Sequence, residues 1–126
     1  MRAAMISACE RYFDALNRID RAAFLACFAP QAEAHDPYGG RPAQGEEGLN
    51  KWFSAMERTW DRFQMTPAEY FVGGDRVAVQ WSAEARAKNG KSATFSGVNV
   101  FTLAPNGEIA RLEAYWDAAA MMAQIS

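Results

Sequence analysis

Histidine and cysteine are scarce in this chain, whose 126 residues include one histidine and two cysteines. A zinc site needs several such ligands close together, so these counts argue against a bound metal. Cys9 and Cys27 both lie among apolar neighbours in helical patterns. We expect both to be small hydrophobic side chains of a reducing, cytoplasmic compartment.

Several longer features are missing as well. No apolar run reaches the roughly 20 residues of a membrane helix, and the first residues lack the pattern of a signal peptide. The net charge is −2 without a basic block, which argues against a nucleic-acid partner. Neither a phosphate-binding loop nor a dinucleotide fingerprint is present, so no cofactor is predicted. We therefore expect a small-molecule substrate or ligand.

Hydrophobic periodicity changes along the chain from helical to alternating. The spacing predicts a helix over 3–17, a short helix that Asp20 caps and Pro30 ends, and a third helix that begins at Glu46. A strand is expected over 32–36, followed by a loop to Gly45. Four strands are expected after the third helix: one that runs into Gly73, then 76–87, 92–103 and 108–117. The tail 118–125 is expected to form a short helix or a loose end. Helices first and antiparallel strands later predict one α+β domain over 1–126.

Two Asn-Gly pairs predict hairpins, at Asn89 and at Asn106. Two-residue turns would pair 82 with 97 and 80 with 99, and then 99 with 114 and 97 with 116. One sheet face would carry Gln80, Ser82, Glu84, Phe95, Gly97, Asn99, Phe101, Leu112, Ala114 and Trp116. The opposite face would carry Val77, Val79, Trp81, Val98, Val100 and Tyr115.

Only one face of this sheet can be covered by the three helices. If they cover the valine face, Asn99 points outward. If they close over the Asn99 face, they form a cone with an internal pocket, and a second subunit covers the valine face. The second arrangement predicts a homodimer through the sheet. It also predicts a pocket closed by the third helix through Trp52, Phe53 and Met56.

The stretch 34–40, Ala-His-Asp-Pro-Tyr-Gly-Gly, carries the candidate base. Asp36 precedes Pro37, and a residue before proline is held extended. The aspartate is therefore expected at a strand end, where a general base is useful. The other interpretation is that Asp-Pro only begins a turn. His35 would point to the opposite face and lie at the rim.

These residues resemble the nuclear transport factor 2-like superfamily, the cystatin-like cone that includes SnoaL-type polyketide cyclases, and most closely bacterial ketosteroid isomerase. The helix Glu10–Asn17 resembles that enzyme's first helix, and Asp36-Pro37-Tyr38-Gly39 resembles its Asp-Pro-x-Gly. The resemblance implies a curved antiparallel sheet wrapped around N-terminal helices. It also implies proton transfer next to a carbonyl through an enolate.

Roles follow from the same resemblance. Asp36 would be the base, while Tyr12 and Asn99 would donate to the enolate oxygen. Asn99 departs from the family's protonated aspartate, but an amide donates without any pKa shift. The substrate-binding residues would be Trp116, Phe101, Trp52, Phe53, Met56, Ser82 and Glu84. Because Ser82 and Glu84 are polar, a smaller or more polar carbonyl compound than a steroid is expected.

Two other functions remain open. Glu84 and Arg86 lie two apart on one strand, and inside the cone such a pair would suit an epoxide hydrolase; outside it, they would form an exposed ion pair. The chain could also be a non-catalytic ligand-binding module, because this fold hosts many functions.

Overall fold

A computed structural model describes residues 1–126. Its elements follow the expected order of helices, one early strand, a third helix and a strand meander. The bounds are α1 Arg2–Asn17, α2 Arg21–Ala26, β1 Phe28–His35, β2 Ala43–Gln44, α3 Gly45–Thr59, β3 Trp60–Gly73, β4 Arg76–Ala87, β5 Ser92–Leu103, β6 Ile109–Trp116 and α4 Ala118–Ile125.

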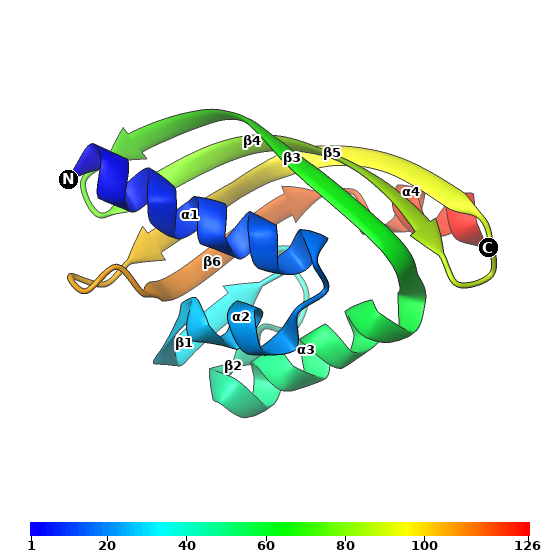
Figure 1. The fold of residues 1–126 in the computed structure, drawn as a ribbon, viewed down its shortest axis with the longest axis horizontal. Helices are drawn as coiled ribbons and strands as arrows, with labels where there is room; N and C mark the ends of the chain where they lie inside the picture. The colour runs from blue at the N-terminus through cyan, green and yellow to red at the C-terminus, as the bar shows by residue number, and fades with distance from the viewer.

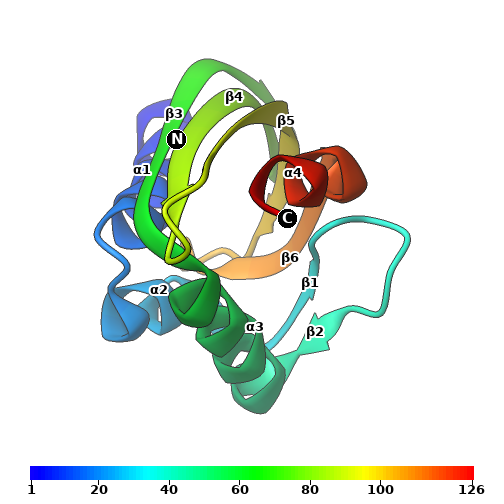
Figure 2. The same ribbon diagram turned by 90° about the vertical axis from the view of Figure 1, so that its right-hand side faces the viewer.

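The six strands form one curved, unclosed sheet in the order β2-β1-β6-β5-β4-β3. All neighbours are antiparallel except β1 and β6, which run parallel. The long strands arch over α1, and α2 and α3 lie below them (Figure 1). Seen end-on, the sheet wraps around an interior, with α4 beside one end (Figure 2). The expected α+β cone is confirmed.

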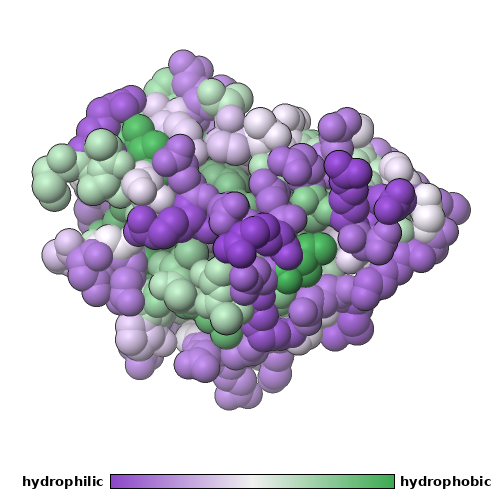
Figure 3. All heavy atoms as spheres, in the orientation of Figure 1, coloured by the Kyte–Doolittle hydropathy of each residue, from purple (hydrophilic) through white to green (hydrophobic).

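The core lies between the concave side of the sheet and the helices. Its fully buried side chains include Tyr12, Phe24, Phe53 and Phe101. The face shown in Figure 3 is mostly hydrophilic, with separate small apolar patches. None of the helices is both long and apolar enough to cross a membrane.

Most predicted boundaries agree with the structure, and β4 and β5 agree at both ends. Asp20 caps α2 as expected, because its side chain accepts a hydrogen bond from the Ala23 N–H at 3.0 Å. The strand expected from 32 begins at Phe28 instead. Pro30 lies exposed within it, where a missing N–H is tolerated. The tail 118–125 is helix α4, and Asp117 caps it.

The predicted register between β4 and β5 is wrong by one residue. Trp81 pairs with Gly97 and Val79 with Asn99. The cause is the turn, because the Ala87 N–H bonds the Lys91 carbonyl at 2.8 Å and leaves three residues in the loop. Gly90 takes φ 89°, as in a three-residue hairpin with a bulge.

The predicted β5–β6 register, 97 with 116 and 99 with 114, is confirmed. This hairpin also has a three-residue loop, since the Ala104 N–H bonds the Glu108 carbonyl at 2.8 Å. A bulge next to Leu103 then shifts the register by one and restores the expected pairs.

The corrected register exchanges the two faces of β4 alone. Val77, Val79 and Trp81 are buried inside the cone, whereas Ser82 and Glu84 are exposed outside it. The expectation that Ser82 and Glu84 line the pocket is therefore wrong. The predicted set of residues on the valine face is also wrong. Only Val98, Val100 and Tyr115 of that set lie on the outer face of the sheet. Asn99 faces inward, 1% exposed, so the helices do cover its face.

Candidate active site

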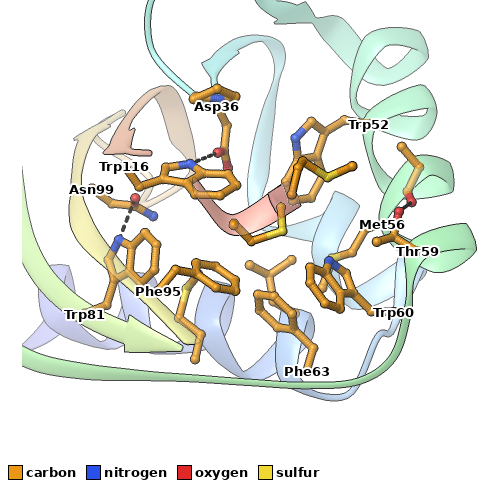
Figure 4. A pocket seen from close by; sticks show the side chains of 16 residues that line it. Asp36, Trp52, Met56, Thr59, Trp60, Phe63, Trp81, Phe95, Asn99 and Trp116 are labelled. Carbon is orange, nitrogen blue, oxygen red and sulfur yellow. Dashed lines mark hydrogen bonds between the residues drawn. The ribbon is translucent and has the colours of Figure 1, made fainter. Parts of the chain in front are cut away.

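A cavity of about 230 Å³ lies within the cone, walled by the sheet, α3 and α4 (Figure 4). Its wall is dominated by aromatic rings and thioethers, with a few polar groups. The lining residues are Leu16, Asp36, Pro37, Trp52, Ala55, Met56, Thr59, Trp60, Phe63, Met65, Trp81, Phe95, Asn99, Trp116, Met121 and Met122.

Asp36 directly follows β1, and its side chain lines this cavity. The next segment is tied to β6, because the Tyr38 N–H donates to the Ala114 carbonyl at 2.8 Å. The Trp116 indole Nε1–H donates to Asp36 Oδ1 at 2.7 Å, drawn as a dashed line in Figure 4. Burial raises the pKa of Asp36 to about 6, and the Trp116 hydrogen bond opposes this rise. The carboxyl therefore titrates close to neutral pH.

Asn99 enters from the middle of β5 and is the one polar residue that is buried as a whole. The Trp81 indole Nε1–H donates to Asn99 Oδ1 at 2.9 Å. Asn99 Nδ2 has no protein partner. Among side-chain polar atoms that are fully shielded from solvent, Tyr70 Oη is the one without a hydrogen bond. Asn99 Nδ2, which also lacks a hydrogen bond, is therefore not fully shielded. Its two N–H donors therefore remain available to the cavity that Asn99 lines.

The predicted site residues fall into three groups. Asp36, Asn99, Trp116, Trp52 and Met56 line the same cavity. Tyr12, Phe53 and Phe101 lie in the core behind its wall, each at most 1% exposed. Ser82 and Glu84 lie on the outer surface, as described above.

Tyr12 packs against Phe101 with ring centroids 5.1 Å apart. Its hydroxyl makes no hydrogen bond within the protein, although it is not a fully enclosed atom. Burial raises the pKa of Tyr12 well above its usual value, and the nearby charge of Asp36 adds to this rise. Tyr12 is therefore a protonated donor within range of the Asp36 charge.

Sequence reasoning missed Trp81, Trp60 and Phe63 as cavity residues. A two-residue turn at Asn89 predicts Trp81 on the outer face, whereas the three-residue loop places it inside. Trp60 and Phe63 belong to β3, whose start at Trp60 continues α3 without a break. No loop signal marks that junction in the sequence.

Other predicted groups lie outside the cavity. Arg86 donates to Asp61 Oδ2 at 2.9 Å on the exposed outer face, so the Glu84–Arg86 pair expected of an epoxide hydrolase does not form inside the cone. His35 Nε2 lies 2.7 Å from Glu33 Oε1, and Arg111 donates to the same oxygen. His35 thus belongs to a charged cluster away from Asp36.

Together these features make a site suited to acid–base chemistry. A carboxyl with a pKa near 6 can take up or release a proton at neutral pH. Fixed N–H donors in a mostly apolar cavity interact strongly with a developing negative oxygen.

Comparison with known proteins gives the following similarities. A family model described as a SnoaL-like domain matches residues 9–112. The steroid Δ-isomerase of Nocardioides simplex is 22% identical over 116 residues, 92% of this chain and 92% of that protein. The epoxide hydrolase/cyclase-like enzyme SalBIII, with a role in pyran ring formation in the polyether salinomycin, superposes with a TM-score of 0.85 at 24% identity, covering 94% and 95%. The Δ5-3-ketosteroid isomerase from Mycobacterium sp. gives 0.82 at 23%, covering 94% and 96%.

Proposed function

The chain belongs to the SnoaL-like domain family, and from this premise we propose that it is an isomerase that moves a proton next to a carbonyl group. One observation carries the proposal. A carboxyl with a pKa near 6, Asp36, lines the same apolar cavity as an amide, Asn99, whose N–H groups have no protein partner. This is a base together with a donor for the oxygen of an enolate.

The reaction has two proton transfers. Asp36, ionised at pH 7, takes a proton from the carbon next to the carbonyl, and the electron pair of that C–H bond forms the enolate. Asn99 Nδ2 donates to the enolate oxygen. Protonated Asp36 then returns the proton to the γ-carbon, which converts a β,γ-unsaturated ketone into its α,β-unsaturated isomer.

Tyr12 is the second proposed donor. Its raised pKa keeps the hydroxyl protonated, and the effect of the Asp36 charge on that pKa supports its closeness to the base. Because Tyr12 does not line the cavity, it would reach the enolate oxygen only after a movement of the wall, and Asn99 is the donor that the mechanism uses. Phe53 and Phe101 support the wall from behind.

The size and lining of the cavity support a small, mostly apolar substrate. A volume of about 230 Å³ is below the ~300–1,000 Å³ of drug-sized ligand sites. Trp52, Trp60 and Trp116 provide flat apolar surfaces. A small cyclic ketone of one or two rings fits this description better than a four-ring steroid.

The test measures isomerisation of small cyclic β,γ-unsaturated ketones by ultraviolet absorbance. Asp36→Asn keeps the shape and the acceptor for Trp116 but removes the base, so kcat should fall by about two to four orders of magnitude. Glu84→Gln, on the outer face, is the matched control and should retain the wild-type rate. Unchanged turnover in Asp36→Asn would refute the mechanism.

A second candidate is opening of an epoxide or closure of a ring, supported by the likeness to SalBIII. In that case the protonated form of Asp36 would act as a general acid on the oxygen. The rate would then rise as the pH falls below the pKa of Asp36, opposite to the isomerase. Binding without turnover of either substrate would indicate a ligand-binding module.

We also propose a homodimer through the outer sheet face. Val98 and Val100 are half-buried on this face, and Phe71 and Tyr115 are 53% and 43% exposed. Paired strands bring these side chains together, since Val98 pairs with Tyr115. A contiguous apolar patch on a sheet is a surface that a second copy can cover.

A further inference from the structure

We propose that Trp81 is a positioning residue that holds Asn99 as a neutral hydrogen-bond donor, and that the site works with an amide there and not with a carboxyl group. The inference rests on the proposed function. It concerns which chemical group at position 99 can donate a hydrogen bond to a negatively charged oxygen.

The hydrogen bond from Trp81 fixes the direction of the amide. An indole N–H can only donate, so the atom of Asn99 at 2.9 Å must be the oxygen. The NH₂ end then points the other way, toward the cavity, as Figure 4 shows. Rotation of the amide by 180° would bring two donors together and leave the indole without a partner. Since Trp81 is 3% exposed and Asn99 1%, water does not replace that bond without cost.

Gly97 makes room for this arrangement. It pairs with Trp81 on one side and with Trp116 on the other. A β-carbon at position 97 would clash with the Tyr115 carbonyl oxygen and lie 2.8 Å from both Trp81 Cζ2 and Trp116 Cβ. The Trp81 ring, whose centroid lies 6.3 Å from that of Trp116, and the backbone of β6 therefore approach position 97 so closely that only glycine fits there.

The same hydrogen bond would act against an aspartate at position 99. A donor that faces a carboxyl group favours its ionised form and lowers its pKa. An ionised carboxylate cannot donate, and it repels a developing enolate. Trp81 therefore suits asparagine, which accepts at one end and donates at the other without titrating.

This reasoning predicts opposite effects of one substitution in two backgrounds. In the wild-type background, Trp81→Phe frees the Asn99 amide to rotate, and kcat should fall by about ten- to hundredfold. In an Asn99→Asp background, Trp81→Phe removes the bond that favours the carboxylate. The pH above which Asn99→Asp loses activity should then move upward by about one unit, and turnover above it should rise by about tenfold.

Trp60→Phe is the matched control. Trp60 lines the same cavity, but its indole makes no hydrogen bond in the structure. The ratio of kcat between Trp81→Phe and Trp60→Phe therefore isolates the hydrogen bond from the lost ring. Equal kcat values for the two variants would refute the proposal. So would identical pH profiles for Asn99→Asp with and without Trp81→Phe.

A binding measurement separates this proposal from the proposed function. Calorimetric titration with a bicyclic phenolate, 2-naphtholate, probes the donors without any turnover. Its affinity should fall about tenfold more in Trp81→Phe than in Trp60→Phe. If no ketone reacts but this difference appears, only the isomerase assignment fails. If ketones react and the difference is absent, the role of Trp81 fails. Thermal unfolding of each variant verifies that it is folded.

Discussion

Replacement of Asp36 by asparagine should stabilise the fold while it stops the reaction. The carboxyl lines an apolar cavity, and burial raises its pKa from 3.8 to about 6. Ionised Asp36 is thus less favourable in the folded protein than in the unfolded chain. Asparagine keeps the acceptor for Trp116 without the charge. Activity and stability should therefore change in opposite directions.

The sign and size follow from proton linkage. The folded pKa lies above the unfolded value, so between pH 3.8 and about 6 the native state holds the extra proton. The stability linked to this group is complete below pH 3.8 and is lost as the pH rises through about 6. At about 1.36 kcal/mol per pH unit, the loss by pH 7 is up to about 3 kcal/mol, and less to the extent that solvent reaches the carboxylate.

The assay compares urea unfolding of the wild type and Asp36→Asn between pH 4 and pH 7.5. The difference in unfolding free energy should grow by up to about 3 kcal/mol toward high pH, which is roughly 10 °C in Tm for a chain of this length. Asp61→Asn, which changes an exposed carboxylate, controls for net charge. A difference that stays constant within about 0.5 kcal/mol would show that the Asp36 carboxylate is not desolvated.

Three further outcomes are expected. For the wild type, kcat/KM should fall below about pH 6 as Asp36 becomes protonated, and a kcat/KM that stays constant through this pH range would refute the role of Asp36 as base. Gly97→Ala should lower Tm and kcat together, because the new methyl group would clash with the Trp81 ring, the Trp116 β-carbon and the Tyr115 carbonyl oxygen; unchanged kinetics would show that the site tolerates this displacement. Val98→Glu should convert a dimer to a monomer in sedimentation at micromolar concentration, and a wild-type monomer would disprove the dimer.

The sequence is sufficient to predict the order of the elements and to predict Asp36, Asn99 and Trp116 as residues of one cavity. Asp36 follows from the restriction that Pro37 imposes, and Asn99 and Trp116 share a face because the β5–β6 register was correct. That success was partly fortunate, since a three-residue loop and a bulge compensate each other there.

The error in the β4 register has one physical source. Asn-Gly favours a two-residue turn, but Asn89 and Gly90 form part of a three-residue loop in which Gly90 alone has positive φ. A shift of one residue moves every side chain of a strand to the other face. The two-residue turn therefore predicts Ser82 at the cavity wall, where the structure has Trp81. Apolar residues alternate along β4 in the sequence; a two-residue turn predicts them on the outer face, whereas they are buried inside the cone.

The placement of Trp81 also changes how the base is understood. If position 99 carried an ionised carboxylate, Asp36 would face a like charge and its pKa would rise further. With a neutral amide there, burial and the Trp116 hydrogen bond are the two influences that set it. Trp116 donates to Asp36, the proposed base, and Trp81 donates to the oxygen of Asn99, the proposed donor. In the proposed mechanism, one indole therefore stabilises the charge of Asp36 and the other orients the Asn99 amide, which is neutral by its own chemistry.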